Sequence, residues 1–550
     1  MTGRMAPNGR FRTVGIDDLF FSTTDRKGVI TGANSVFERL SAFPRQELMG
    51  APHNVIRHPG MPGGAFRIMW DKLLAGQPFA AYVRNLAKDG FAYWVFATIT
   101  PLGQNFLSVR AAPCALEIWQ SASALYDQTI PLEEEARRSG MSRADAALLG
   151  RDALSGMLAQ AGFGSYEEFM FTALPAEATA RVADSSERRL PSSAHGEVAE
   201  IMAAALELGA QLTLVLGRLD ALQLLATGLL NGSDQLSGTL KDLSRVTELA
   251  SVASGRVEER APVLASTARA MNTIGAGVQS VISPLVEKLS TVRNTVMELR
   301  FRIALAHLHD DMVIRFALEV LDGLAPPKGL TYVPLLCQSL SDDVQQLSQD
   351  MAETGAILRR VALEIDSCTA QFGQFQKLLS TWRLQVPRYG LSNTLGPLVG
   401  PIDAQLNASH DQLANLRRLA GQCSAEAKPF DNEALFGPIS RISHIAGSLV
   451  GPEPPLPAAP ALPPQLPLTA AVPPPRAGAT PIAALPPLPV IPAPPSYQPG
   501  TVPTASGGSP TVSVTATPAA DLDHLPPVPW LATSQDRPPR HSGFESRQSR

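Results

Sequence analysis

Short apolar runs separated by turn residues fill the first 115 residues of the chain. Residues 19–23 and 29–31 are typical of two strands, and the segment between them carries Asp25 and Gly28, which favour a turn. Three further strands are predicted at residues 79–86, 91–100 and 105–112, and apolar spacing predicts a helix at 65–74. This order predicts an α+β domain: a five-stranded antiparallel sheet with short helices.

Beyond residue 118 the pattern changes to the period of helices. Ser142 and Ser165 are suited to cap two helices of a connector. Apolar residues then recur at alternating steps of three and four over residues 212–243 and 274–303, which is typical of heptad seams, and we expect Pro284 to kink or restart the second helix. Long all-α bundle or coiled-coil helices are therefore predicted.

Proline and glycine mark the breaks in the second half of the chain. Further helices are predicted at 333–382 and 406–449, with breaks at 387–390 and 396–397. More than half of the 48 prolines follow residue 450, which indicates a disordered tail without a core. The predicted organisation is disorder over 1–13, the α+β domain over 14–118, a helical connector over 119–190, long helices over 191–325, further helices over 326–450 and a Pro/Ala-rich tail over 451–550.

Charge and cysteine content exclude several classes of protein. A net charge of −4 gives no basic surface for nucleic acid, so none is expected as a partner. The four cysteines form no Cys-x-x-Cys pair, which disfavours a zinc site and a disulfide framework. The most apolar stretch, 201–230, is interrupted by Glu207, Arg218 and Asp220, so we expect no membrane span and a cytoplasmic location.

A group of motifs in the α+β region resembles the PAS domain of the bacterial aerotaxis receptors over residues 14–118. The resemblance rests on Asp25-x-x-Gly28, Asn34, Arg57-His58-Pro59-x-Met61-Pro62, Trp70, Asn85, Asp89-Gly90 and Tyr93-Trp94-Val95. It implies a pocket between the sheet and the short helices that holds FAD noncovalently, with the redox state of the flavin as the signal. It also implies flavin-binding roles for Arg57, His58 and Asn85, with Asn34 and Tyr93 as further candidates. Gly60 and Phe79 depart from the family pattern, which usually has an aspartate and an indole there.

The chemistry of these side chains supports more than one interpretation. Arg57 is always charged and can pair with a phosphate or an anionic ring, while Asn85 can donate to and accept from a heteroaromatic edge. Alternatively, Arg57 and His58 close a loop by bonding to carbonyl groups. Haem ligation by His53 or His58 is a third interpretation, since imidazole suits iron.

Motifs for catalysis are missing from the sequence. There is no Walker-type phosphate loop, Gly-x-Ser-x-Gly elbow or His-Glu-x-x-His pair, so no enzymatic activity is expected. The polar run 307–311 has two histidines that point to different helix faces, and we expect a solvated patch there and no metal site. The Asn/Ala/Ile/Glu-rich hairpin tip of chemoreceptors also has no match.

These patterns together predict a cytoplasmic PAS sensor of the redox, oxygen or energy-taxis type. Its state would pass through the helices to a protein partner, and the seams predict a homodimer, because exposed heptad stripes must be buried against another helix. The alternative is a non-enzymatic scaffold or dimerisation protein with a ligand-free PAS domain. The Pro-rich tail either docks to a partner or serves as a flexible extension.

Overall fold

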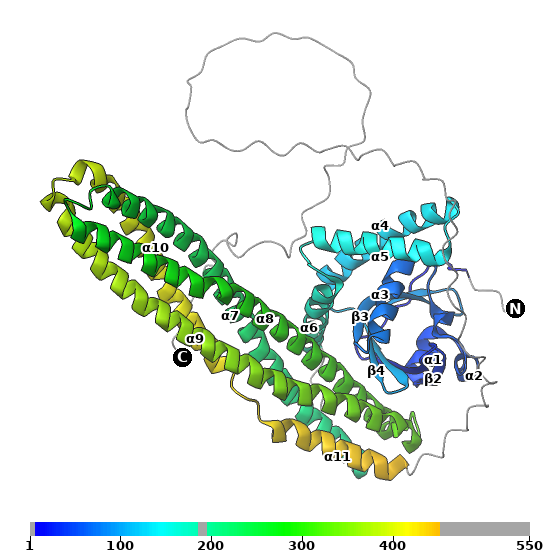
Figure 1. The fold of residues 1–550 in the computed structure, drawn as a ribbon. Coiled ribbons are helices and arrows are strands. Elements are labelled where there is room, and N and C mark those ends of the chain that lie inside the picture. The colour runs from blue at the N-terminus through cyan, green and yellow to red at the C-terminus, as the bar shows by residue number, and fades with distance from the viewer. Residues whose placement is uncertain (1–5, 185–194, 451–550) are drawn as a thin grey trace, which may run out of the picture. The chain divides into compact units, whose positions relative to one another are not determined.

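The computed structural model describes residues 6–184 and 195–450 of the 550-residue chain (Figure 1). Its N-terminal part is a five-stranded antiparallel sheet with strand order β2-β1-β5-β4-β3. The predicted α+β fold, with five strands and short helices, is confirmed. The elements are β1 (Phe20–Asp25), β2 (Ile30–Ala33), α1 (Ser35–Ser41), α2 (Arg45–Leu48), η1 (His53–Ile56), α3 (Gly63–Leu74), β3 (Phe79–Leu86), β4 (Ala92–Leu102) and β5 (Asn105–Ala111).

The hairpin between β3 and β4 shows how local sequence sets the register of the sheet. Gly90 has a φ of +84°, a left-handed conformation that a residue with a Cβ rarely adopts, so the Lys88-Asp89-Gly90 turn closes tightly. Ala87 N donates to Phe91 O at 2.8 Å across the base of this turn. Asn85 consequently lies directly opposite Tyr93. Both side chains therefore point to the same face of the sheet.

Residues 6–13 were expected to be disordered, and this prediction is wrong for the part that the structure describes. Asn8 N donates to Gly90 O at 2.9 Å and Arg12 N donates to Ala92 O at 2.7 Å. The segment is ordered because its main chain pairs with the exposed start of β4, which the sequence pattern does not show. The domain thus begins ahead of β1.

The rest of the described chain is helical. The helices are α4 (Leu116–Arg138), α5 (Arg143–Gln160), α6 (Tyr166–Asp184), α7 (Glu197–Gly255), α8 (Pro262–Leu321), α9 (Val333–Arg388), α10 (Ser392–Glu426) and α11 (Asn432–Val450), with a short 3-10 turn η2 (Pro327–Tyr332) before α9. Figure 1 shows α7, α8, α9 and α10 as long helices lying side by side, in agreement with their extensive mutual contacts. The two predicted seams are buried along α7 and α8, as Leu212, Leu243, Val278 and Leu299 illustrate. The predicted Pro-rich tail, 451–550, lies outside the described residues.

The break predicted at 396–397 is wrong, and the second seam helix does not restart at Pro284. Pro284 lies inside the continuous α8, and Pro397 lies inside α10. A proline costs a helix about 3 kcal/mol, and the seam on either side offsets this, since Ile282 and Leu285 are both fully buried against neighbouring helices. The break predicted at 387–390 is confirmed, because α9 ends at Arg388.

The polar run of α8 was expected to be solvated, and this is wrong as well. His309 and Asp310 are 0 % exposed and Asp311 is 3 % exposed. Helices α6, α7 and α9 all pack against α8, and Arg181 Nε of α6 donates to Asp311 Oδ2 at 3.1 Å. Burial on all sides explains the error, because a seam pattern identifies only one buried face. Within residues 6–184 and 195–450, no cluster of three potential metal ligands is present.

Helix α7 is long and apolar enough to cross a membrane when judged by length and composition alone, and it is the only such helix in the described ranges. In the structure, 44 % of its most apolar 18-residue window is buried against other parts of the protein. A core helix of a bundle meets the same criteria. The absence of a membrane span therefore stays a prediction.

Candidate functional site

A cavity of about 210 Å³ lies between one face of the sheet and the helices η1 and α3. Its wall is mostly apolar and includes Ile56, Met61, Met69, Val83, Ile99 and Phe106. The few polar side chains in the wall are therefore informative, because they fix the chemistry that the cavity can accommodate.

Alternation along the strands places this cavity and helix α6 on opposite faces of the sheet. On β3, Ala81, Val83 and Asn85 line the cavity. Tyr82, which lies between Ala81 and Val83, points to the opposite face, where its hydroxyl donates to Glu177 Oε1 of α6 at 2.7 Å. Successive residues of a strand face opposite sides of the sheet. The sheet is thus a single layer with the cavity on one face and helices on the other.

Asn85 carries the clearest signal for a ligand. Its side chain is only 3 % exposed, and its Nδ2 atom has no hydrogen-bond partner in the structure. A buried donor left unpaired costs about 1–3 kcal/mol. A ligand with an acceptor atom at this point of the cavity would remove that cost, so the arrangement favours an occupant that accepts a hydrogen bond.

Arg57 lies at the wall and combines both roles considered for it. Its Nη2 atom donates to the carbonyl of Met61 at 3.1 Å, which closes the loop before α3, and its guanidinium carbon lies 4.0 Å from the ring centroid of Phe66. The side chain nevertheless lines the cavity. The backbone of Arg57 also pairs with that of Asn85, so the loop places both residues at one edge of the cavity.

Three other candidate residues lie outside the cavity lining. His58 Nδ1 accepts from Gly60 N at 2.9 Å, and burial together with the nearby Arg84 lowers the pKa of His58 to about 4. Asn34 caps α1, accepting from Phe37 N at 3.1 Å and donating to Leu19 O at 3.0 Å. Both side chains therefore stabilise the frame of the domain.

Tyr93 points to the same face as Asn85 but lies deeper, beneath α1. It is fully buried in a core with Phe20 and Phe37, and its ring lies 6.5 Å edge-on from that of Phe20. Its hydroxyl has no hydrogen-bond partner, and burial raises the pKa of Tyr93 to well above the usual value. Tyr93 therefore shapes the floor beside the cavity.

Arg110 on β5 is a functional candidate that the sequence analysis missed. It lines the cavity, is 6 % exposed, donates from Nη1 to Ser22 Oγ at 3.2 Å, and lies 4.9 Å from the Phe20 ring centroid. No carboxylate pairs with it in the part of the chain that the structure describes. Burial lowers the pKa of Arg110 to about 10, which still leaves it charged at neutral pH. The sequence could have indicated this position, because residues 106, 108 and 110 alternate along one strand and therefore share the face of Phe106 and Ser108, which also line the cavity.

His53 is the histidine of the cavity wall. Its Nε2 atom lies 3.2 Å from Ser22 Oγ, and burial together with Arg110 lowers the pKa of His53 well below its usual value. The imidazole is therefore neutral at pH 7. Haem ligation by His58 is not supported, because His58 lies outside the lining, and His53 Nε2 already has a hydrogen-bonding partner.

The wall as a whole fits one face of a flat heteroaromatic ring. Aliphatic and aromatic side chains provide the apolar contact, Asn85 provides a free donor, and Arg110 provides a buried positive charge. A flavin ring carries acceptor atoms on an otherwise flat, apolar frame, so the residues present fit such a group.

Comparisons with known proteins agree on the nature of this region. A family model described as "PAS fold" matches residues 30–106. The aerotaxis receptor of Escherichia coli (strain K12) is 45 % identical over 107 residues, covering 18 % of this chain and 21 % of the receptor. The nitrogen fixation regulatory protein of Klebsiella pneumoniae is 32 % identical over 81 residues, covering 15 % of this chain and 16 % of that protein. The chain thus spans about a fifth or less of these curated relatives.

Solved structures with similarity to the chain include the PAS domain of a Colwellia psychrerythraea protein, with 22 % identity, a TM-score of 0.16, and coverage of 17 % of this chain and 86 % of that one. A fungal LOV domain photoreceptor has 19 % identity, a TM-score of 0.17, and coverage of 20 % and 83 %. The family model covers β2, β3 and β4 of the sheet together with η1 and α3, which enclose the cavity. The N-terminal region of the chain is therefore a PAS domain similar to that of the aerotaxis receptor.

Proposed function

We propose that the PAS cavity binds a flavin and that this flavin is FAD. We also propose that the protein senses redox state, oxygen or energy level and has no enzymatic activity. The observation that carries the proposal is the unpaired, buried Nδ2 of Asn85 in a mostly apolar wall. Similarity to the aerotaxis receptor supports it. A bound flavin would supply reversible electron uptake, and the protein would supply binding, orientation and electrostatics.

The candidate residues divide into two groups under this proposal. Asn85 donates to an acceptor on the ring edge, Arg110 stabilises negative charge on the ring, and Arg57 lies at the edge of the cavity where it can reach a phosphate. His58, Asn34 and Tyr93 act indirectly. They hold the loop before α3, the start of α1 and the floor beneath it.

The route to the helices runs through β1. Ser22 bonds to Arg110 on the cavity side, while its neighbour Phe21 contacts Phe316 of α8 and Tyr332 of η2 with ring centroids 5.3 and 4.9 Å apart. Ser35 Oγ also donates to Glu319 Oε1 at 3.0 Å. A change in charge at Arg110 would shift β1 and, with it, the packing of α8. Packed interfaces of this kind tend to adopt discrete arrangements, which suits a signal relay to a protein partner.

We further propose a cytoplasmic homodimer. The long seams of α7 and α8 are already buried within one chain, so the second copy would use remaining apolar side chains such as Leu224 of α7 and Leu363 of α9, which are 75 % and 70 % exposed. Apolar side chains exposed on long helices favour association. The mass of the purified chain in solution tests this part independently of the ligand.

A binding titration tests the flavin proposal. The full chain, stripped of any co-purified ligand, is titrated with riboflavin, and quenching of flavin fluorescence is measured for the wild type, Asn85→Ala and Asn105→Ala. Asn105 is an exposed asparagine of the same sheet and serves as the matched control. We expect Asn85→Ala to weaken binding about tenfold, the value of one hydrogen bond to a buried site, and Asn105→Ala to leave it unchanged. A folded wild type that binds no riboflavin would favour the ligand-free scaffold.

A further inference from the structure

A second groove, of about 510 Å³, borders the PAS cavity and is enclosed on one side by the connector helices α4 and α5. The two hollows share Asn54, Arg57, Phe66 and Trp70 in their walls. The cavity and the groove are therefore neighbours, with these four side chains between them. A ligand that occupies both hollows would pass along these side chains.

Arginines dominate the charge of this groove. Arg57 and Arg67 come from the PAS domain, and Arg137 and Arg143 come from α4 and α5, whereas Glu133 is the only acidic side chain in the lining. Both carboxylate oxygens of Glu133 are already occupied, since they accept from Gly63 N at 2.7 Å and Gly64 N at 2.8 Å. Glu133 thus neutralises the start of α3 and leaves the guanidinium groups for another anion.

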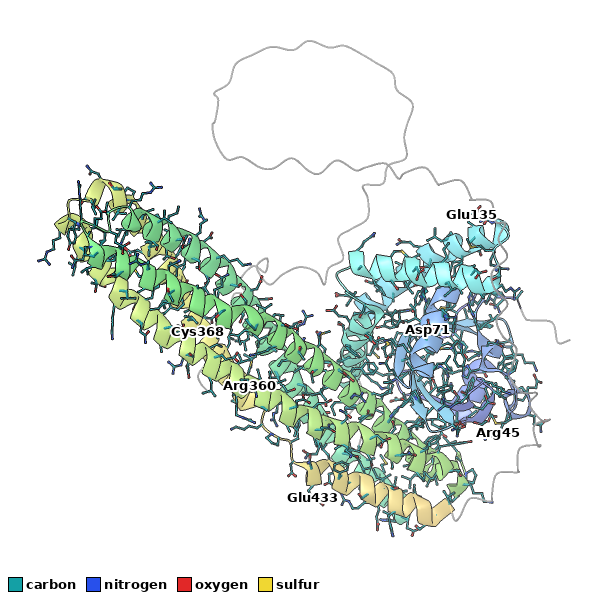
Figure 2. All side chains as sticks on the ribbon, in the orientation of Figure 1. Arg45, Asp71, Glu135, Arg360, Cys368 and Glu433 are labelled. Carbon is teal, nitrogen blue, oxygen red and sulfur yellow. The ribbon has the colours of Figure 1, made fainter. Side chains whose placement is uncertain are left out.

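The two connector arginines are the least satisfied of the four. Arg67 pairs with Asp71, a residue of α3 labelled in Figure 2, at 2.9 Å. The side chains of Arg137 and Arg143 form no ion pair and no hydrogen bond within the described ranges of the chain, and both are exposed. Arg143 is also the first residue of α5, where the helix dipole disfavours a cation unless an anion is nearby.

From this arrangement we infer that Arg137 and Arg143 bind the phosphate groups of a ligand whose ring lies in the PAS cavity, so that the connector completes the binding site. The inference rests on the proposed flavin function and deepens it. The cavity of about 210 Å³ is smaller than the 300–1,000 Å³ typical of pockets that enclose a whole ligand, so the remainder of a dinucleotide needs a second compartment. Planar guanidinium groups match phosphate geometry.

The consequence is a ligand that fastens the connector to the PAS domain. Helix α5 already packs on α3, where Arg151 Nη1 lies 3.8 Å from Asp71 Oδ2. Phosphates bound between Arg57 on one side and Arg137 and Arg143 on the other would bridge the same two elements. Arg137 and Arg143 would then distinguish a nucleotide with phosphates from riboflavin. Both arginines lie beyond the PAS fold, which ends near residue 111.

The experiment compares FAD with riboflavin on the ligand-free full chain at about 0.1 M salt, where exposed charges still interact over about 10 Å. The variants are Arg137→Gln, Arg143→Gln, their combination, and Arg138→Gln as control. Arg138 lies on the same turn of α4, pairs with Glu135 and lies outside the groove. We expect the double variant to lose about tenfold or more in FAD affinity and none in riboflavin affinity, with the control unchanged.

Several outcomes would overturn the inference. Equal wild-type affinities for FAD and riboflavin, or a double variant that binds FAD as the wild type does, would show that the connector arginines do not hold phosphate. Inorganic pyrophosphate is the third probe and separates the two proposals. A wild type that binds pyrophosphate but no flavin, with binding lost in the double variant, would contradict the flavin function and support the anion groove. Flavin binding that none of the variants changes would support the flavin function and contradict the anion groove.

Discussion

The docking of the connector on the PAS domain depends on two glycines, and Gly64→Ala tests it. Gly64 of α3 faces Gly150 and Arg151 of α5 so closely that a Cβ at position 64 would lie 2.3 Å from Arg151 N and from Gly150 C. These are backbone atoms and cannot rotate away. Carbon contacts are most favourable at about 3.5–4.0 Å, so the two helices would have to separate by about 1 Å or more.

The expected cost follows from that separation. Overpacking of a tight contact destabilises by about 1–3 kcal/mol, and the higher helix propensity of alanine returns at most about 1 kcal/mol, so we expect a net loss of about 1–2 kcal/mol. The hydrogen bonds from Gly63 and Gly64 to Glu133 would lengthen at the same time. The connector should therefore loosen from α3, and the affinity for FAD should fall with it.

Urea unfolding followed by tryptophan fluorescence measures this effect, because Trp119 of α4 lies 5.9 Å from Trp94 of β4 and reports on connector docking. The matched control is Gly156→Ala on the partner helix α5, where a Cβ would meet no atom within 4 Å. We expect that control to stabilise by about 0.5–1 kcal/mol. A Gly64→Ala midpoint equal to or above that of the wild type would refute the tight α3–α5 contact.

Three further predictions concern charge and relay. Arg110→Met removes a buried charge that no carboxylate compensates, so we expect the free energy of unfolding to be unchanged or higher. We expect riboflavin affinity to fall about tenfold, and an unchanged affinity would exclude Arg110 from the binding site. Burial raises the pKa of Asp343 to about 7 despite Arg302 Nη1 at 3.7 Å, and Asp342 adds to the rise. The native state therefore binds the extra proton between about pH 4 and 7, and the free energy of unfolding falls as pH rises through 7. Asp343→Asn should be about 1–3 kcal/mol more stable than the wild type at pH 8. A variant that is less stable than the wild type at pH 8 would contradict the direction of this effect. Phe316→Ala removes the ring contact with Phe21 and should abolish ligand-dependent protection of α8 in hydrogen exchange while riboflavin still binds; retained protection would place the relay elsewhere.

Local patterns were sufficient for much of the fold. The strands around the Lys-Asp-Gly turn and the seams of α7 and α8 follow from periods of 2 and 3.6, which depend on near neighbours in the chain. The same reasoning failed at Pro397, and it offered a restart at Pro284 that the structure does not show, because a proline penalty is local whereas the burial that offsets it comes from distant helices. It failed at His309 for the same reason, since three helices surround that part of α8.

The candidate site was predicted in part. Arg57 and Asn85 line the cavity, but His58 and Asn34, which share the same sequence motifs, use their polar atoms to hold the local frame. A motif shows that residues occur together without showing which way each side chain points. Arg137 and Arg143 could not be found in this way, because they enter the groove only once α4 and α5 pack on α3.

The absorption spectrum of the full chain as purified, with the cofactor released by heat and identified, tests the flavin sensor most directly. A PAS cavity that holds FAD predicts a yellow protein with the near-ultraviolet and blue bands of an oxidised flavin, bleached by anaerobic reduction, and FAD in the released material. A folded, colourless protein would contradict flavin sensing and favour a ligand-free scaffold, and a Soret band would indicate haem in its place.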